Sequence, residues 1–181
     1  MRMLVMIVLL LAVALVALLA TRPDRFHVER SATIDAPSST VFSHIDDFHR
    51  WTAWSPWEKI DPQLQRSYDG PHSGVGAGYR WSGSSQVGEG SMRITESIPD
   101  RKVGIALEFI KPFRASNVAT FTLAPEGPAT RVTWAMDGTN SWLAKLIGLF
   151  MSMDRMVGTE FEKGLATLKQ VCESTPPVPP A

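Results

Sequence analysis

The sequence has 181 residues, of which 18 are Lys or Arg and 18 are Asp or Glu, so its formal net charge at pH 7 is zero. This balance, without any run of basic residues, argues against nucleic acid as a partner, because such binding depends on neutralising phosphates. The only cysteine is Cys172, which excludes an intrachain disulfide and is compatible with either side of a membrane.

The chain begins with an uninterrupted apolar run from Met3 to Ala20. As a helix this run would be about 27 Å long, close to the thickness of the hydrocarbon core of a bilayer. A secretory signal has a shorter apolar region and small residues at its cleavage site, whereas here Leu18 stands where a small residue is preferred. We therefore expect residues 1–22 to form a transmembrane anchor, with a signal peptide as the alternative.

Basic residues flank both ends of this apolar run. Arg2 precedes it, and Arg22 and Arg25 follow it. The excess of positive charge after the run weakly favours a cytoplasmic domain. A short amino tail is also compatible with the opposite orientation, so the side of the membrane stays open.

Residues 23–173 suit one domain with a sizeable core. Phe26–Ile34 alternates apolar and polar residues and predicts a strand. Thr40–Phe48 has its apolar residues at helical spacing and predicts a short helix. The next segment, Arg50–Pro62, contains internal prolines that prevent it from forming a single helix.

That segment carries Trp51, Trp54 and Trp57 at intervals of three residues. A tryptophan offers a large apolar face and one N–H donor, which suits either a packed lid over the core or the aromatic wall of a ligand site. We favour closure of the core and keep the ligand wall as the alternative. Glu58 is expected to be a surface carboxylate.

From residue 76 onwards the apolar period changes to two, which predicts antiparallel strands with one buried face. Prolines, glycines and Asp100 between the runs supply the turns. The predicted strands lie within residues 76–84, 87–97, 102–110, 117–125 and 130–138.

The last periodic segment, Trp142–Val171, contains no proline and has apolar residues every three or four positions. It predicts one long amphipathic helix that lies across the apolar face of the sheet. Residues 174–181 are proline-rich and are expected to form a disordered tail. The fold class is therefore α+β.

Six segments of the chain are distinctive in their order and spacing: FHVERSATIDAP, VFSHIDDFHRW, WSPWEKIDP, GPHSGVGAGYRW, VGEGSM and TRVTWAMDG. With them, the order of elements resembles the SRPBCC or START-like superfamily, and more narrowly the bacterial proteins of polyketide cyclase/dehydrase type. The resemblance implies a helix-grip fold, in which a curved antiparallel sheet of six to seven strands wraps a long C-terminal helix. It also implies an apolar cavity between sheet and helix, without a universal catalytic set. The apolar N-terminal run is not part of this fold, and we expect it to anchor the chain in a bacterial inner membrane.

The residues expected to face such a cavity are large apolar side chains from the tryptophan segment and the strands. An ordinary solid core is the alternative. Gly88 and Gly90 favour a cavity because they remove volume beside Met92, whose flexible side chain adapts to irregular contents. The candidates are Trp54, Trp57, Tyr79, Trp81, Met92, Leu107, Phe109, Phe121, Trp134 and Met136.

Signals for catalysis or metal binding are weak. The four histidines lack ligand-like spacing, so neither a metal nor a cofactor is expected. The glycines of Gly74–Gly78 precede a strand, whereas a dinucleotide fingerprint follows one.

The sequence predicts a single-pass, membrane-tethered module that holds a hydrophobic or amphipathic small molecule, lipid-like or polyketide-like. The first alternative is a cyclase or dehydrase that uses the same cavity, with Tyr79 as general acid or base. The second alternative is a non-catalytic protein-interaction domain with the tryptophan segment as an exposed patch.

Overall fold

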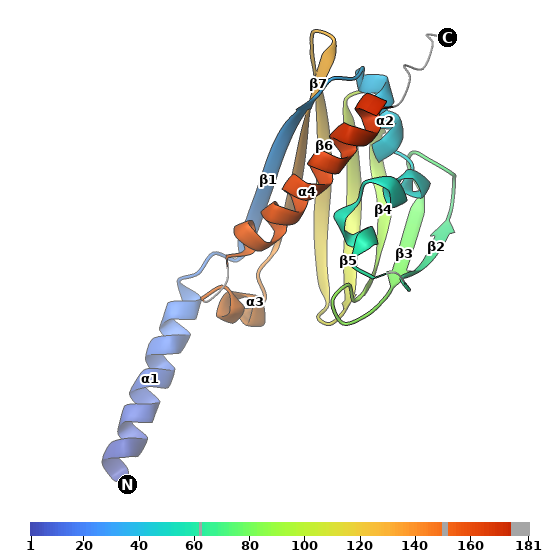
Figure 1. Cartoon of the computed structure of the whole chain (residues 1–181). Coiled ribbons are helices and arrows are strands. Elements are labelled where there is room, and N and C mark those ends of the chain that lie inside the picture. Colours follow the sequence, from blue (N-terminus) through green and yellow to red (C-terminus); the bar gives the residue numbers. More distant parts are fainter. Residues whose placement is uncertain (62, 150–151, 175–181) are drawn as a thin grey trace.

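A computed structural model gives the structure of the chain and describes residues 1–61, 63–149 and 152–174. Within these residues, seven strands form one antiparallel sheet in the order β1-β7-β6-β5-β4-β3-β2. Helix α4 crosses one face of this sheet, and α1 projects away from the domain (Figure 1). The arrangement confirms the predicted α+β helix-grip fold.

The bounds of the elements follow the predicted strands closely. The strands are β1 (Arg25–Ile34), β2 (Gln65–Asp69), β3 (Gly78–Ser82), β4 (Glu89–Ile98), β5 (Lys102–Lys111), β6 (Ala115–Glu126) and β7 (Ala129–Thr139). The helices are α1 (Arg2–Ala20), α2 (Ser38–Ile45), the 3-10 helices η1 (Phe48–Ala53) and η2 (Pro56–Lys59), α3 (Trp142–Ile147) and α4 (Met153–Ser174).

Strand β2 has no counterpart among the predicted elements. It forms the edge of the sheet, where Arg66 pairs with Trp81 and Tyr68 pairs with Tyr79 of β3. Most of its side chains are exposed. Its sequence has no alternating apolar pattern, so the sequence does not reveal this strand. Its backbone pairing with β3 shows it to be one.

The prediction of one continuous helix over Trp142–Val171 is wrong. Helix α3 ends at Ile147 and is capped by Gly148, whose N–H donates to the carbonyl of Ala144, and α4 begins at Met153. Glycine is a poor helix former, and α3 contacts α1 rather than continuing along the sheet. The first predicted turns of the helix therefore form a separate element.

Two glycines let α4 lie close to the sheet. A Cβ atom at Gly164 would lie 2.8 Å from the ring of Trp134 and 3.0 Å from Pro56. At Gly158 the same space is occupied by the guanidinium group of Arg30 on β1. Arg30 donates hydrogen bonds to Asp154 and Glu162, which fastens β1 to α4.

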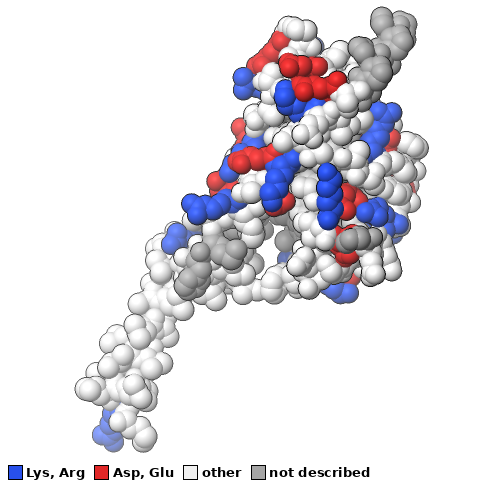
Figure 2. Space-filling view, in the orientation of Figure 1, with Lys and Arg blue, Asp and Glu red and all other residues white. Residues whose placement is uncertain are grey.

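Helix α1 has a mean hydropathy of 3.3 and is long and apolar enough to cross a membrane. Charged side chains are scattered over the face of the domain seen in Figure 2, whereas α1 is free of them beyond its first turn. A signal sequence has the same features. At the other end of the chain, α4 includes Ser174, and residues 175–181 of the predicted tail lie outside the described residues.

Candidate functional site

The tryptophan segment closes the C-terminal end of α2. The ring N–H of Trp51 donates to the carbonyl of Ile45 at 2.9 Å, and that of Trp54 donates to the carbonyl of His44 at 3.0 Å. The last carbonyls of a helix lack partners within the helix, so the two indoles satisfy them. Both side chains are buried.

A stack of aromatic rings connects this segment to the sheet and to α4. Trp134 of β7 stacks on Phe161 of α4 with ring centroids 4.0 Å apart, and on Phe121 of β6 at 4.8 Å. Trp54 and Trp57 each meet Trp134 edge-on at 5.7 Å. Four of the ten candidate side chains belong to this stack, Trp54, Trp57, Phe121 and Trp134, and of these only Trp57 is partly exposed.

The register of the strands places the other six candidates together. Met92 of β4 lies between Tyr79 of β3 and Leu107 of β5. Trp81 and Phe109 flank Gly90 in the next row, nearer the loop between β5 and β6. Met136 of β7 lies beside the row that contains Leu107. Its sulfur accepts a hydrogen bond from the side chain of Asn117, which pairs with Leu107 in that row.

Asn117 of β6 was not among the predicted site residues. It pairs directly with Leu107 and is buried. Its Nδ2 lies 3.9 Å from the Met136 sulfur, and its Oδ1 has no hydrogen-bond partner among the described residues. A buried acceptor without a partner costs about 1–3 kcal/mol. The alternation of β6, which also buries Ala119 and Phe121, is the signal that could have found it.

The two glycines expected to leave volume beside Met92 do not leave it open. A Cβ atom at Gly90 would lie 2.5 Å from the ring of Trp81, so that ring occupies the space. Gly88 precedes β4 and has a φ of +70°, which glycine adopts without strain. These glycines therefore serve close packing and a turn.

A polar group adjoins the apolar set at Tyr79. Its hydroxyl donates to Oε1 of Glu58 at 2.7 Å, and Nε of Arg66 donates to Oε2 at 2.5 Å. The Glu58 side chain is only 6% exposed, so the expectation of a surface carboxylate is wrong. Burial, and then the hydrogen bond to Glu58, raises the pKa of Tyr79 far above its ordinary value. The phenol is therefore a neutral donor at physiological pH.

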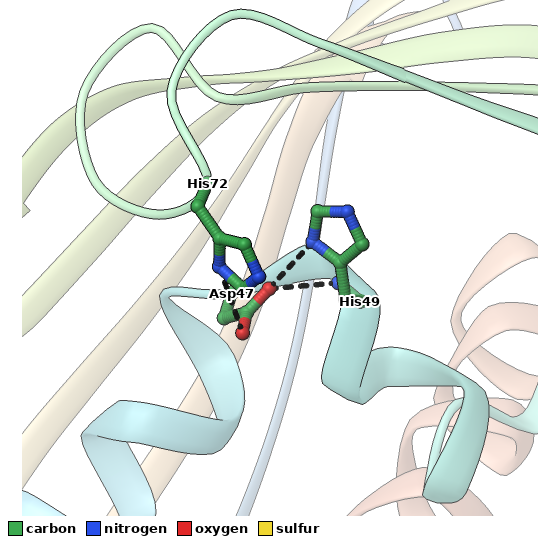
Figure 3. A group of neighbouring side chains, drawn as sticks. All are labelled: Asp47, His49 and His72. Carbon is green, nitrogen blue, oxygen red and sulfur yellow. Dashed lines mark hydrogen bonds and ion pairs between the residues drawn. The ribbon is translucent and has the colours of Figure 1, made fainter.

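A second polar cluster joins Asp47, His49 and His72 (Figure 3). Asp47 accepts from the backbone N–H and the ring Nδ1 of His49, both at 2.9 Å, and lies 3.4 Å from Nδ1 of His72. These three residues could supply metal ligands. The imidazoles, however, stack with centroids 4.3 Å apart and planes 18° apart, so their in-plane lone pairs do not converge on one point. In this arrangement the hydrogen bonds of His49 and the close contact of His72 are directed at the Asp47 carboxylate.

Two hollows of about 240 and 290 Å³ open on the solvent side of the sheet. Polar and charged side chains dominate their linings, among them Arg80, Ser91 and Glu108. Neither lining includes a residue of α4, but Tyr79 and Met92 of the apolar set line the first hollow and Trp81 lines the second, so both hollows adjoin that set.

Comparison with known proteins identifies the family. Residues 25–173 match the sequence profile of the family described as polyketide cyclase/dehydrase and lipid transport. None of the curated proteins matches the chain.

Solved structures share the fold at low sequence identity. A protein from Chromobacterium violaceum is 14% identical with a TM-score of 0.59, over 85% of this chain and 100% of that chain. A protein from Nitrosospira multiformis is 20% identical with a TM-score of 0.60, over 82% and 97%. The Aha1 dimer from Colwellia psychrerythraea is 15% identical with a TM-score of 0.54, over 82% and 97%. The matched profile covers nearly the whole domain, and the chain therefore belongs to the polyketide cyclase/dehydrase and lipid transport family.

Proposed function

We propose that the chain is a membrane-tethered module that binds a hydrophobic or amphipathic small molecule, lipid-like or polyketide-like, on the inner face of its sheet. The observation that carries this proposal is the buried Oδ1 of Asn117, which has no hydrogen-bond partner in the described part of the chain and lies among the apolar side chains of Leu107 and Met136. A ligand hydroxyl or amide that donates to this oxygen would remove the cost of leaving it unpaired.

The surrounding side chains suit the apolar part of such a ligand. Phe109 and Met92 are only partly buried against the core. The ring of Phe109 meets that of Trp81 edge-on at 5.8 Å, and Met92 pairs with the buried Leu107. Each ligand methylene removed from water there would contribute about 0.8 kcal/mol. The description of the family, which includes lipid transport, fits a ligand of this class.

Helix α1 supplies the tether in this proposal. It would cross a bacterial inner membrane once, with the domain following directly after residue 22. The basic residues at both ends of the helix leave its orientation open.

A second candidate is an enzyme of the cyclase or dehydrase type at the same place. The hydrogen-bonded pair of Tyr79 and Glu58 favours it, because a buried donor next to a carboxylate is a common general-acid arrangement. Tyr79 would act as the donor, since its raised pKa keeps the phenol protonated. The interaction-domain alternative has less support, because Trp51 and Trp54 are buried rather than exposed.

Native mass spectrometry of the full chain, released from detergent micelles after expression in bacteria, tests the binding proposal. We expect a reproducible adduct of lipid-like mass. Asn117→Leu removes the unpaired oxygen, and Leu107→Trp fills the site, so each variant should lose the adduct. Val118→Leu is the matched control, because Val118 follows Asn117 in β6 but its side chain is half exposed on the opposite face of the sheet.

An empty wild-type chain, or an adduct that survives both Asn117→Leu and Leu107→Trp, would overturn the proposal. Circular dichroism of each variant establishes that the fold is retained. An adduct whose mass changes with time in the wild type, but stays constant in Tyr79→Phe, would identify the enzyme instead.

A further inference from the structure

Helix α3 has an inverted distribution of side chains. Trp142 is 58% exposed, and the three other large apolar residues of this short helix, Leu143, Leu146 and Ile147, are 37–41% exposed. The buried residue of the helix is Lys145. A helix on a water-exposed surface normally turns its apolar side inward. Helix α3 therefore presents an apolar surface that the domain does not cover.

Polar contacts hold α3 beside the C-terminal end of α1. The ammonium group of Lys145 pairs with the carboxylate of Asp24 at 2.5 Å and lies 5.4 Å from the ring centroid of Trp142. Asn140 donates its backbone N–H to Asp24 and its side-chain amide to the carbonyl of Pro23. The two helices are also in direct contact (Figure 1). The position of α3 is thus fixed relative to the residue at which α1 ends.

The same end of the sheet carries a further exposed aromatic residue. Phe113, in the loop between β5 and β6, is 57% exposed. The antiparallel order places this loop at the end where β1 begins and β7 stops, because Arg25 pairs with Thr139 and Asn117 pairs with Gly138. Exposed apolar side chains therefore gather at the end of the domain from which α1 leaves.

We infer that α3, together with Phe113, docks into the interfacial layer of the bilayer that α1 crosses. This inference rests on the proposed tether. If α1 spans the membrane, residues 21–24 lie at the interface, and α3, fixed to Pro23 and Asp24, lies at the same depth. Tryptophan and leucine on a short helix are the side chains that this layer accepts, and the exposed Arg22 and Arg25 suit anionic head groups.

Docking of this kind gives the domain a defined orientation. The row of Trp81, Gly90 and Phe109 lies toward the docked end, because Phe109 pairs with Ala115 at the start of β6. An apolar ligand would then pass between the bilayer and the proposed site with little exposure to water. The tether alone would leave the orientation of the domain free.

The test uses the full chain in nanodiscs of phosphatidylcholine and phosphatidylglycerol. Single cysteines at Leu10, Leu146 and Gln170, in a Cys172→Ala background, carry an environment-sensitive nitrobenzoxadiazole label. Gln170 lies on the exposed side of α4, far along the helix from α3, and is the control. We expect quenching of the Leu146 label by lipids with a nitroxide near the head group, quenching of the Leu10 label by a nitroxide deep in the acyl chain, and no quenching at Gln170.

The outcomes separate the docking from the tether. A Leu146 label that stays in water while the Leu10 label is quenched would overturn docking and leave the tether standing. A Leu10 label in water would overturn the tether and, with it, this inference. Quenching at Gln170 equal to that at Leu146 would show collapse of the whole domain onto the lipid and would overturn docking through α3. In a further variant, Trp142→Ser/Leu143→Ser, the Leu146 label should lose its quenching.

Discussion

The hydroxyl of Tyr79 donates a 2.7 Å hydrogen bond to the carboxylate of Glu58, which joins strand β3 to the 3-10 helix η2. Arg66 of β2 holds the other carboxylate oxygen. Three separate segments therefore meet at one nearly buried carboxylate, and this contact fixes the tryptophan segment over the edge of the sheet.

Replacing Tyr79 by Phe removes the donor and leaves one buried oxygen of Glu58 without its partner. We expect a loss of about 1.5–3 kcal/mol in the free energy of unfolding, the range for a hydrogen bond to a charged group. Urea unfolding of the full chain in detergent, followed by near-UV circular dichroism, measures it. Tyr68→Phe is the control and should change stability by less than about 0.5 kcal/mol, because Tyr68 lies at the sheet edge and is partly exposed. Equal effects of the two variants would contradict the role of Glu58.

The stack of Phe161 on Trp134 joins α4 to the middle of the sheet. Phe161→Ala should lower the free energy of unfolding by about 3–5 kcal/mol, because it removes a fully buried ring and leaves a cavity in its place. It should also shift tryptophan emission to longer wavelength as water reaches Trp134. The exposed Gln170→Ala on the same helix should leave both quantities unchanged. A Phe161→Ala variant with unaltered emission would mean that α4 does not pack on Trp134.

Gly164 allows α4 to approach Trp134 and Pro56. A methyl group at this position would raise helix propensity by about 1 kcal/mol but would lie 2.8 Å from a rigid indole ring. We expect the clash to prevail, so that Gly164→Ala lowers the melting temperature. Thr159→Ala on the exposed side of α4 tests propensity alone and should leave the melting temperature unchanged or higher. Stabilisation by both substitutions would refute the close approach.

His44 is buried, and neither ring nitrogen has a hydrogen-bond partner among the described residues. Burial, followed by the nearby charge of Arg50, lowers the pKa of His44 below its ordinary value of 6.5. As the pH falls through about 6.5, the unfolded chain takes up a proton that the folded chain resists. The contribution of neutral His44 to the free energy of unfolding is therefore fully present above about pH 7. It is lost as the pH falls toward the folded-state pKa of His44.

His44→Leu should remove this dependence and give a flatter stability profile between about pH 7 and pH 5 than the wild type. Urea unfolding at several pH values measures the difference. The exposed His27 has a pKa raised by Asp137 and contributes in the opposite sense, but it is present in both chains and cancels in the comparison. Parallel profiles would show that His44 is solvated in the folded state.

The strands with one buried face could be read from the sequence because alternation is a local consequence of strand geometry. It predicted β1 and β3 to β7. The edge strand β2 could not be found this way, since Arg66 and Tyr68 are ordered by pairing with Trp81 and Tyr79. The helical period of residues 142–171 correctly indicated helix at both ends of this segment. It could not show that α3 is separate from α4 and contacts the end of α1.

For the site, the sequence determined which side chains share a face of each strand, as for Tyr79, Met92 and Leu107. Only the tertiary structure decided which of them become neighbours, because the register between strands depends on turns and on burial elsewhere. It also brought Glu58 to Tyr79 and packed rings around Trp134 over the middle of the sheet. Among the residues that the structure describes, it left the side-chain oxygen of Asn117 without a hydrogen-bond partner. Periodicity is a property of the chain's own backbone, whereas these contacts join segments whose separation in the sequence carries no information about their distance in space.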